Sequence, residues 1–176
     1  IDAESGDPVF SFIPQQLLPN LTTYYQDEGG FTNKAYGLDA GMAVWRYDAN
    51  SNGSIVNSSG GIDIAETDEH IYIYQGMRRG GKTLYALDVT LRQSPKLLWQ
   101  INGNADLDGD GSSDATTGFT DLGQTWSVPQ RAKIKWDCAT AGDTTTCDDK
   151  YVLFFGGGYD TKHDTAPDSN DDEGNA

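Results

Sequence analysis

Apolar and polar residues alternate in several short stretches of this chain, with the two-residue period that is typical of β-strands. The segment HIYIYQ at His70–Gln75 alternates strictly, and Gly-rich or Asp/Asn-rich turns lie around it. No ten-residue window has the spacing of an amphipathic helix, and only Gln15–Leu18 is expected to form a short helical turn. Strands are predicted at Ala43–Tyr47, His70–Gln75, Thr83–Asp88, Lys96–Ile101, Gln124–Val128, Ala132–Trp136 and Tyr151–Phe155.

The spacing of these strands favours an all-β fold built from small sheets. The three strands between residues 70 and 101 have short connections and predict a meander, and the strands between 124 and 155 open a second unit of similar kind. Propellers repeat four-stranded sheets at about 40–50 residues per blade, so the chain has room for at most about four blades. We expect an irregular segment at 1–40, blades of a partial or irregular β-propeller at 41–161, and an acidic loop or disordered end at 162–176.

The charge of the chain limits its partners. With 27 acidic and 12 basic residues it carries a net charge of -15. Such a surface repels phosphate backbones and anionic lipids, so nucleic-acid binding is excluded as the main function, and no direct membrane insertion is expected. It attracts cations, although most of the acidity could equally serve solubility or life in a salty habitat.

The two cysteines, Cys138 and Cys147, lie between two apolar runs in the segment WDCATAGDTTTCDDK. A disulfide there would staple the end of a long hairpin and stabilise the fold by about 2–3 kcal/mol. Two free thiols are the alternative, and the spacing without a nearby histidine does not fit a zinc site. The predicted disulfide indicates an oxidising compartment.

The strongest chemical signal is the segment Asp106–Asp114, which reads D-x-D-x-D-G-x-x-D. Alternate carboxylates in such a loop point toward one cation, and Gly111 allows the sharp turn after the third ligand. Thr117 stands where an EF-hand has its bidentate Glu, so the loop is EF-hand-like. An extended acidic turn is the alternative, but each pair of carboxylates in it would repel by about 0.7 kcal/mol in water. The expected calcium ligands are Asp106, Asp108, Asp110, the backbone carbonyl of Ser112, and Asp114.

A second, weaker loop runs from Asp48 to Ile55 and fits D-x-[DN]-x-[DN]-G-x-I. It has a single carboxylate, and an Asn-Gly turn without metal is an equally good reading. If it binds calcium, the affinity is expected in the weak extracellular range, about 10⁻⁴–10⁻³ M. The expected ligands are Asp48, Asn50, Asn52 and Ser54, with Asp63, Glu66 or Asp68 completing the set.

No pattern of catalytic residues accompanies these loops. The only histidines, His70 and His163, lie in no recognisable metal-site or triad pattern. Paired carboxylates are frequent, but the sequence places none of them in a dry cleft. We therefore expect that the chain is not an enzyme.

Several segments, in order along the chain, resemble the C-terminal propeller domain of the PilY/PilC family of type IV pilus biogenesis factors and tip adhesins. They are FIPQQLLPNL, AVWRYDANSNGSI, HIYIYQGMRRGGKTLYALDVT, SPKLLWQI, DLGQTWSVP and YVLFFGGGYDT, and they span most of residues 12–161. The combination of GMRRGG, LYALDVT, LGQTWS and FGGGYD is specific, whereas any one of them alone is not. The family's long N-terminal region, often with a von Willebrand A-like adhesive domain, has no counterpart here, and we expect a fragment or a cut mature protein.

The resemblance implies an exported, irregular propeller that acts in pilus biogenesis, surface attachment and twitching motility. The implied partners are pilins or other pilus proteins and a host or abiotic surface, at an extracellular, pilus-associated or cell-surface location reached through the periplasm. Members carry a calcium-binding EF-hand-like loop, and the resemblance favours Asp48, Asn50 and Asn52 because their loop follows VWR as in many relatives. The loop at 106–114 looks like an insertion, and its metal assignment rests on its own chemistry.

The pattern LYALD followed by LLW also resembles the blades of quinoprotein dehydrogenases, which is the alternative function. Those enzymes need a calcium-quinone site, a general-base Asp and commonly adjacent cysteines. Cys138 and Cys147 are not adjacent, and 176 residues are too few for a closed eight-bladed ring. An ordinary β-hairpin with core aromatics is the third reading of the same pattern.

Overall fold

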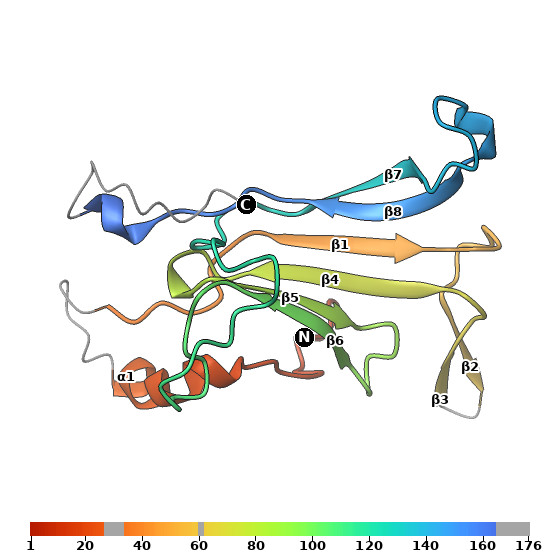
Figure 1. The fold of residues 1–176 in the computed structure, drawn as a ribbon. Coiled ribbons are helices and arrows are strands. Elements are labelled where there is room, and N and C mark those ends of the chain that lie inside the picture. Colours follow the sequence, from red (N-terminus) through yellow and green to blue (C-terminus); the bar gives the residue numbers. More distant parts are fainter. Residues whose placement is uncertain (27–33, 60–61, 165–176) are drawn as a thin grey trace.

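The computed structural model describes residues 1–26, 34–59 and 62–164, and its architecture is mainly antiparallel β-sheet (Figure 1). A four-stranded sheet has the order β1-β4-β5-β6, and two hairpins, β2–β3 and β7–β8, accompany it. The strands are β1 (Met42–Tyr47), β2 (Val56–Ser59), β3 (Ile62–Ala65), β4 (His70–Gly76), β5 (Thr83–Asp88), β6 (Lys96–Asn102), β7 (Gln130–Trp136) and β8 (Asp148–Phe154). The helix α1 (Leu21–Gln26) follows a 3₁₀-helix at Gln15–Asn20, and further 3₁₀ turns lie at Arg78–Gly80, Thr144–Thr146 and Thr161–Asp164.

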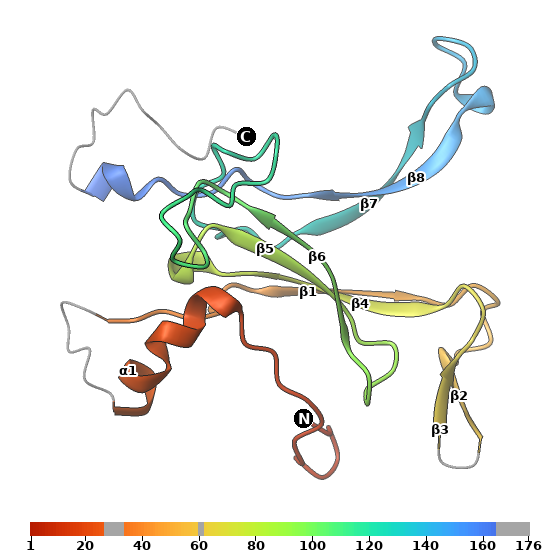
Figure 2. The same ribbon diagram turned by 60° about the horizontal axis from the view of Figure 1, so that its bottom comes forward.

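The four-stranded sheet is an up-and-down meander into which the β2–β3 hairpin is inserted. The meander predicted between residues 70 and 101 is confirmed, because β4 pairs with β5 and β5 pairs with β6, all antiparallel. The first strand, β1, joins the same sheet along β4. In both views of the fold the β2–β3 hairpin projects from the end of the sheet where β1 ends and β4 begins (Figures 1 and 2).

Different segments cover the two faces of the sheet. On one face Tyr85 of β5 packs with Leu17 and Met77, and Phe12 and Leu38 close this cluster. The opposite face carries the aromatic side chains that meet the β7–β8 hairpin, which lies on the other side of the sheet from the N-terminal segment (Figure 2). The sheet is therefore the middle layer of the described structure.

A row of aromatic and cationic side chains joins the hairpin to the sheet. The ring centroids of Trp45 in β1 and Tyr151 in β8 are 4.9 Å apart. The guanidinium of Arg131 in β7 lies over both rings, 4.9 Å from the Trp45 centroid and 5.0 Å from the Tyr151 centroid. Cation–π contacts of this kind stabilise by about 0.5–2 kcal/mol, depending on desolvation.

The segment 124–128 is not the strand that its sequence predicts. Gln124 makes only an isolated β-bridge. The hydroxyl oxygen of Thr125 accepts the N–H of Met77 at 2.7 Å, and its carbonyl accepts the N–H of Arg78 at 3.1 Å. Because Thr125 is hydrogen-bonded to the loop after β4, its backbone carbonyl does not pair with a neighbouring strand.

Two further local features differ from the expectation. The short helical turn expected at Gln15–Leu18 continues as helical backbone to Gln26, and the buried side chain of Leu17 anchors it against the sheet. Packing of one apolar side chain can hold a helix of this length, which is not stable alone. The β2–β3 hairpin was not expected either, although a Gly-Gly pair at 60–61, which lies outside the described residues, separates its two strands in the sequence.

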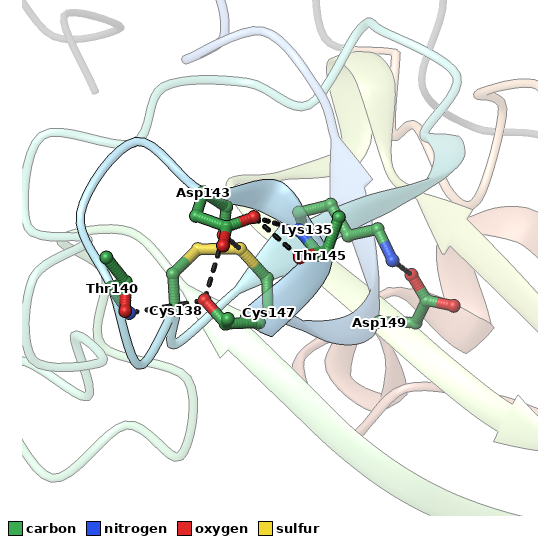
Figure 3. Close-up of a disulfide and its surroundings, with 8 residues drawn as sticks. Lys135, Cys138, Thr140, Asp143, Thr145, Cys147 and Asp149 are labelled. Atoms are coloured by element: carbon green, nitrogen blue, oxygen red, sulfur yellow. Dashed lines mark hydrogen bonds and ion pairs between the residues drawn. A yellow bond between two sulfur atoms is a disulfide. The ribbon is translucent and has the colours of Figure 1, made fainter.

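The predicted disulfide between Cys138 and Cys147 is confirmed, with a Cα–Cα distance of 3.9 Å (Figure 3). It closes the tip of the hairpin directly beyond the last pair of β7 and β8, Trp136 and Asp148. Inside the closed loop the carboxylate of Asp143 accepts the N–H of Thr145 at 2.9 Å and its hydroxyl at 2.6 Å. The tip is therefore held by both a covalent bond and a capped turn.

The described strands form a sheet and hairpins, and they do not close into a ring. The helices of the described ranges are all too short or too polar to span a lipid bilayer.

Candidate metal-binding loops

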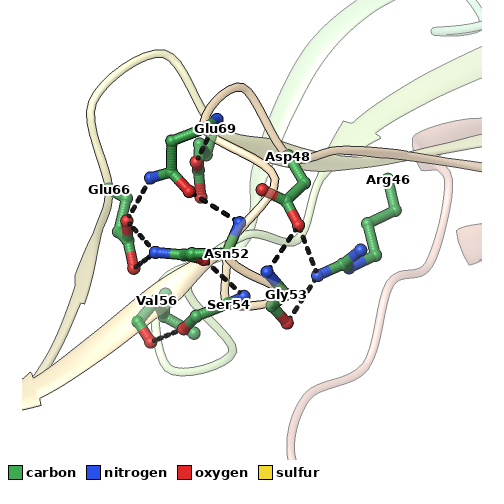
Figure 4. Close-up of polar contacts among 9 residues, drawn as sticks. Arg46, Asp48, Asn52, Gly53, Ser54, Val56, Glu66 and Glu69 are labelled. Atoms are coloured by element: carbon green, nitrogen blue, oxygen red, sulfur yellow. Dashed lines mark hydrogen bonds and ion pairs between the residues drawn. The ribbon is translucent and has the colours of Figure 1, made fainter.

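Two acidic loops emerge from strands of the central sheet. The first loop (residues 48–55) connects β1 to β2, and the second loop (residues 106–114) follows β6. Figure 4 shows the first loop together with the acidic side chains that come from the end of the β2–β3 hairpin. The two loops share the spacing of their polar side chains, so their conformations can be compared position by position.

The first and sixth positions of both loops are joined by the same hydrogen bond. The N–H of Gly53 donates to Oδ2 of Asp48 at 2.9 Å. The N–H of Gly111 donates to Oδ2 of Asp106 at 2.9 Å. This bond folds each loop back on its first carboxylate. The other oxygen of Asp106 accepts the N–H of Gly109 at 2.7 Å, whereas the other oxygen of Asp48 has no partner.

The third and fifth positions also behave alike. In the first loop Oδ1 of Asn50 and Oδ1 of Asn52 each accept the N–H two residues further on, at 2.8 and 2.7 Å. In the second loop Oδ1 of Asp108 and Oδ1 of Asp110 do the same, at 3.2 and 2.7 Å. Successive Asx turns of this kind orient alternate side chains toward one side of the backbone.

The backbone of both loops enters the left-handed region at the same two positions. The fourth position is Ser51 in the first loop and Gly109 in the second, with φ of 59° and 82°. The sixth is Gly53 and Gly111, with φ of 85° and 87°. Glycine adopts this conformation without steric cost, whereas Ser51 bears some strain there.

Two glutamates complete the surroundings of the first loop. The carboxylate of Glu66 accepts the side-chain amide of Asn50 at 2.7 Å and that of Asn52 at 3.0 Å. Glu69, which directly precedes β4, accepts the backbone N–H of Asn50 through Oε1 at 3.3 Å. The guanidinium of Arg46 contacts Asp48 at 3.3 Å and donates to the carbonyl of the loop glycine at 2.7 Å.

Two carboxylate oxygens at the first loop are buried without a hydrogen-bond partner. They are Oδ1 of Asp48 and Oε2 of Glu69, and Glu69 as a whole is only 5% exposed. Leaving a buried acceptor unpaired costs about 1–3 kcal/mol, and more for a charged group. Two such oxygens beside one turn indicate that the first loop is suited to hold a cation.

The second loop gathers three carboxylates on the surface. One oxygen each from Asp106, Asp108 and Asp114 lie within 4.8 Å of one another, and all three residues are exposed. The N–H groups of Gly111 and Gly109 lower the pKa of Asp106, so this carboxylate stays charged at reduced pH. An all-oxygen, fully charged set of this kind suits a hard divalent cation.

The structure brings together most, but not all, of the residues that the sequence singles out. Asp110 lies outside the three-carboxylate group of the second loop, and its Oδ1 accepts the N–H of Ser112. In the first loop the hydroxyl of Ser54 donates to the carbonyl of Val56 at 2.8 Å. The predicted metal roles of Ser54 and of the backbone carbonyl of Ser112 stay predictions.

Among the acids expected to complete the first loop, Glu66 reaches it and Asp63 is engaged elsewhere. The Asp63 carboxylate accepts the hydroxyl of Ser58 at 2.6 Å and pairs with Arg92 at 3.0 Å. Sequence reasoning missed Glu69, the acid that is most deeply buried beside the loop. Its position directly before the alternating strand β4 could have indicated this burial, because side chains next to a strand continue its alternation between the two faces of the sheet.

No family model, no curated protein and no solved structure matches this chain. The arrangement of the two loops therefore has to be interpreted from its own chemistry.

Proposed function

We propose that this chain is a calcium-binding module of an exported type IV pilus assembly and tip adhesin protein of the PilY/PilC kind. In this proposal both loops bind Ca²⁺, and calcium orders the rim of the sheet. The observation that carries the calcium part is the pair of buried, unpartnered carboxylate oxygens of Asp48 and Glu69 beside the first loop. A divalent cation bound at this loop would supply a partner for such an oxygen.

Calcium is favoured over other cations by the donor set. Every candidate ligand is an oxygen from a carboxylate, an amide or a backbone carbonyl, whereas zinc and copper prefer nitrogen and sulfur. Calcium accepts irregular, flexible shells, and magnesium requires a near-ideal octahedron. The neutral amides of Asn50 and Asn52 reduce the charge of the first loop, so its affinity is expected to be weak and suited to millimolar extracellular calcium.

Export and a pilus role rest on different support. The disulfide of the β7–β8 hairpin is typical of proteins that mature in an oxidising compartment. The four-stranded meander has the strand number of a propeller blade, which supports a partial propeller. The ordered set of motifs that resembles the family supports action in pilus biogenesis, surface attachment and twitching, with pilins and a host or abiotic surface as partners.

Calcium binding is tested by isothermal titration of the purified chain after chelator treatment. Wild-type protein is expected to bind two Ca²⁺ ions, Asp48→Asn to lose the first-loop site, and Asp108→Ala, which removes the side-chain oxygens, to lose the second. Asp39→Asn removes the same charge from an exposed residue outside both loops and is expected to titrate like wild type. Unchanged titration of Asp48→Asn would contradict the assignment of the first loop.

The pilus role is tested separately in the source organism. Replacing the chromosomal gene by the Asp48→Asn allele is expected to reduce surface piliation and twitching, while the Asp39→Asn allele leaves both unchanged. Normal piliation of a strain that lacks the gene would reject the pilus role, whatever the titration shows.

A further inference from the structure

A pocket of about 740 Å³ lies between the loop after β4 and the segment after β8, away from both acidic loops. Its wall includes three aromatic rings, one guanidinium, one amide and one carboxylate, contributed by Tyr36, Arg79, Gln124, Trp126, Tyr159 and Asp164. Ligand pockets typically combine aromatic walls with a few convergent polar groups. The composition of this pocket is therefore that of a site for a small polar molecule with an apolar face.

Two adjacent arginines, of which Arg79 lines the pocket, have no acidic partner in the described residues. Arg78 and Arg79 are both exposed, and neither guanidinium belongs to an ion pair there, in a chain with 27 acidic residues. They lie instead over Trp126, with guanidinium carbons 4.4 and 5.6 Å from its ring centroid. Arg79 also donates to the hydroxyl of Tyr36 at 2.9 Å. The guanidinium of Arg79 is thus held in one orientation, and it retains N–H groups that can donate to an anion.

The backbone that carries these arginines is held in a costly conformation. Arg78 has a φ of 53°, which is rare for a residue with a long side chain. A Cβ at Gly80 would lie only 1.9 Å from the carbonyl oxygen of Gly37, so the two segments touch through backbone alone. Met77, at the start of the turn, is fully buried. Strained and rigid backbone of this kind accumulates at ligand-binding positions.

The remaining polar groups offer both a donor and an acceptor set. The hydroxyl of Tyr159 donates to Oδ1 of Asp164 at 2.7 Å, which orients the carboxylate at the pocket wall. The indole N–H of Trp126 donates to Oε1 of Gln124 at 3.2 Å, which fixes the amide. Trp126 and Tyr159 are 36% and 37% exposed, so part of each ring is open to a ligand.

We propose that this pocket, the Arg79 pocket, binds a carboxylated sugar such as a hexuronic acid. The apolar C–H face of the sugar ring packs on Trp126 or Tyr159, and the sugar carboxylate pairs with Arg79. Sugar hydroxyls donate to Asp164 and exchange hydrogen bonds with Gln124. This assignment uses the aromatic rings, the guanidinium, the amide and the carboxylate of the pocket wall.

A carboxylated sugar fits better than an acidic peptide. The net charge of -15 and the carboxylate of Asp164 repel a segment with several acidic side chains. A single carboxylate on a body rich in hydroxyls satisfies Arg79 and Asp164 together. The inference deepens the surface-attachment part of the proposed function, but it rests on residues outside both calcium loops, so calcium binding would survive its failure.

The experiment follows the indole N–H resonance of Trp126, assigned with Trp126→Phe, while D-galacturonic acid is titrated into the full chain by NMR. Galacturonate is expected to shift this resonance, and D-galactose is expected to bind at least about tenfold more weakly because it lacks the charge-assisted hydrogen bonds to Arg79. Acetate and a short Asp/Glu peptide are titrated in parallel as comparison ligands.

Variants separate the pocket from general charge effects. Arg79→Gln is expected to lower galacturonate affinity by about tenfold or more, and Asp164→Asn is expected to weaken galacturonate and galactose alike. Arg92→Gln removes the same charge at an exposed arginine outside the pocket and should bind like wild type. Absence of any galacturonate-dependent shift, equal binding by Arg79→Gln, or tighter binding of the acidic peptide would overturn the proposal.

Discussion

Glu69 lies at the junction between the inserted β2–β3 hairpin and β4, and it is the least exposed acid of the described residues beside either loop. One of its oxygens holds the backbone N–H of Asn50, and the other has no partner. A carboxylate in this position is costly unless a cation pairs with it. The same argument applies to Asp48, the first residue of the loop, because its Oδ1 is also buried without a partner.

Replacing Glu69 by Gln is expected to separate calcium binding from folding. The amide keeps the size and one oxygen but removes the charge, so first-loop affinity for Ca²⁺ should fall about tenfold or more. Without calcium the variant should be as stable as wild type, because the unpaired buried charge is gone. Calorimetric titration and thermal unfolding in chelator measure the two effects. Wild-type calcium affinity of Glu69→Gln would show that this carboxylate does not contact the ion.

Asp149 in β8 makes the stability of the β7–β8 hairpin depend on pH. Its carboxylate contacts the ammonium groups of Lys133 at 2.6 Å and Lys135 at 2.9 Å, and the hydrogen bond from Lys133 is the main reason why its pKa falls from 3.8 to about 2. A depressed folded-state pKa adds stability above the unfolded pKa, and this stability disappears as the pH falls through the folded pKa.

The pH profile of Asp149→Asn tests this contribution. The variant should unfold at a slightly lower temperature than wild type at pH 7, since the group is exposed and solvent screens it. The difference should shrink between pH 3.8 and about 2, the interval that the folded-state pKa defines. Thermal melts by circular dichroism at several pH values measure it. A difference that persists unchanged at pH 2 would mean that the lost contact is not electrostatic.

At the scale of elements, the β7–β8 hairpin extends beyond the sheet, and we expect the disulfide at its tip to stabilise it. The disulfide joins residues that are nine apart in sequence, just outside the last strand pair. The Cys138→Ser/Cys147→Ser double variant is expected to lose about 2–3 kcal/mol of unfolding free energy on the chain-entropy model. Urea denaturation measures the loss, and amide exchange should accelerate first in the tip.

Reduction provides the control for that variant. Dithiothreitol should bring wild-type protein to the stability of the double variant and leave the double variant unchanged. If dithiothreitol destabilised both proteins equally, the effect would come from somewhere other than this bond.

Strands could be predicted from the sequence where a local alternation of apolar and polar residues was sufficient to determine them. The strict alternation of HIYIYQ and the turns around it determine β4 and its neighbours, because a half-buried strand needs that period. Residues 124–128 also contain strand-favouring residues, yet Thr125 bonds to a loop that only the folded chain brings near. A hydrogen-bond partner 48 residues away leaves no trace in a local pattern.

In the two loops, too, the local turn could be predicted from the sequence, whereas the contacts with the rest of the fold could not. The spacing of Asp and Asn with a glycine at position six predicts the turn, since local Asx hydrogen bonds alone produce it. The spacing does not reveal that Asp110 lies outside the group formed by the other three carboxylates, nor that Glu69 is buried beside the first loop. Both facts depend on how the loops meet the sheet.

At the scale of the whole molecule, the charge of -15 opposes compaction, and two ways of relieving it can be distinguished. Sodium ions only screen, with a Debye length of about 10 Å at 0.1 M, so raising NaCl should increase Tm modestly. Calcium at the same ionic strength should add a further increase because it binds the folded state. At a hundredfold excess over Kd each site contributes about 2.7 kcal/mol, which is about 5–10 °C for a chain of this size.

The Asp48→Asn/Asp108→Ala double variant separates screening from binding. Its response to NaCl should match that of wild type, since screening depends on total charge, and 25 of the 27 acidic residues remain (27 − 2 = 25). The extra increase in Tm with CaCl₂ should disappear, because each loop has lost a carboxylate that the proposal assigns to the ion. Thermal melts in NaCl and CaCl₂ at matched ionic strength give both quantities from one preparation. Equal increases in the two salts for wild-type protein would mean that calcium acts on this surface only as a screening ion.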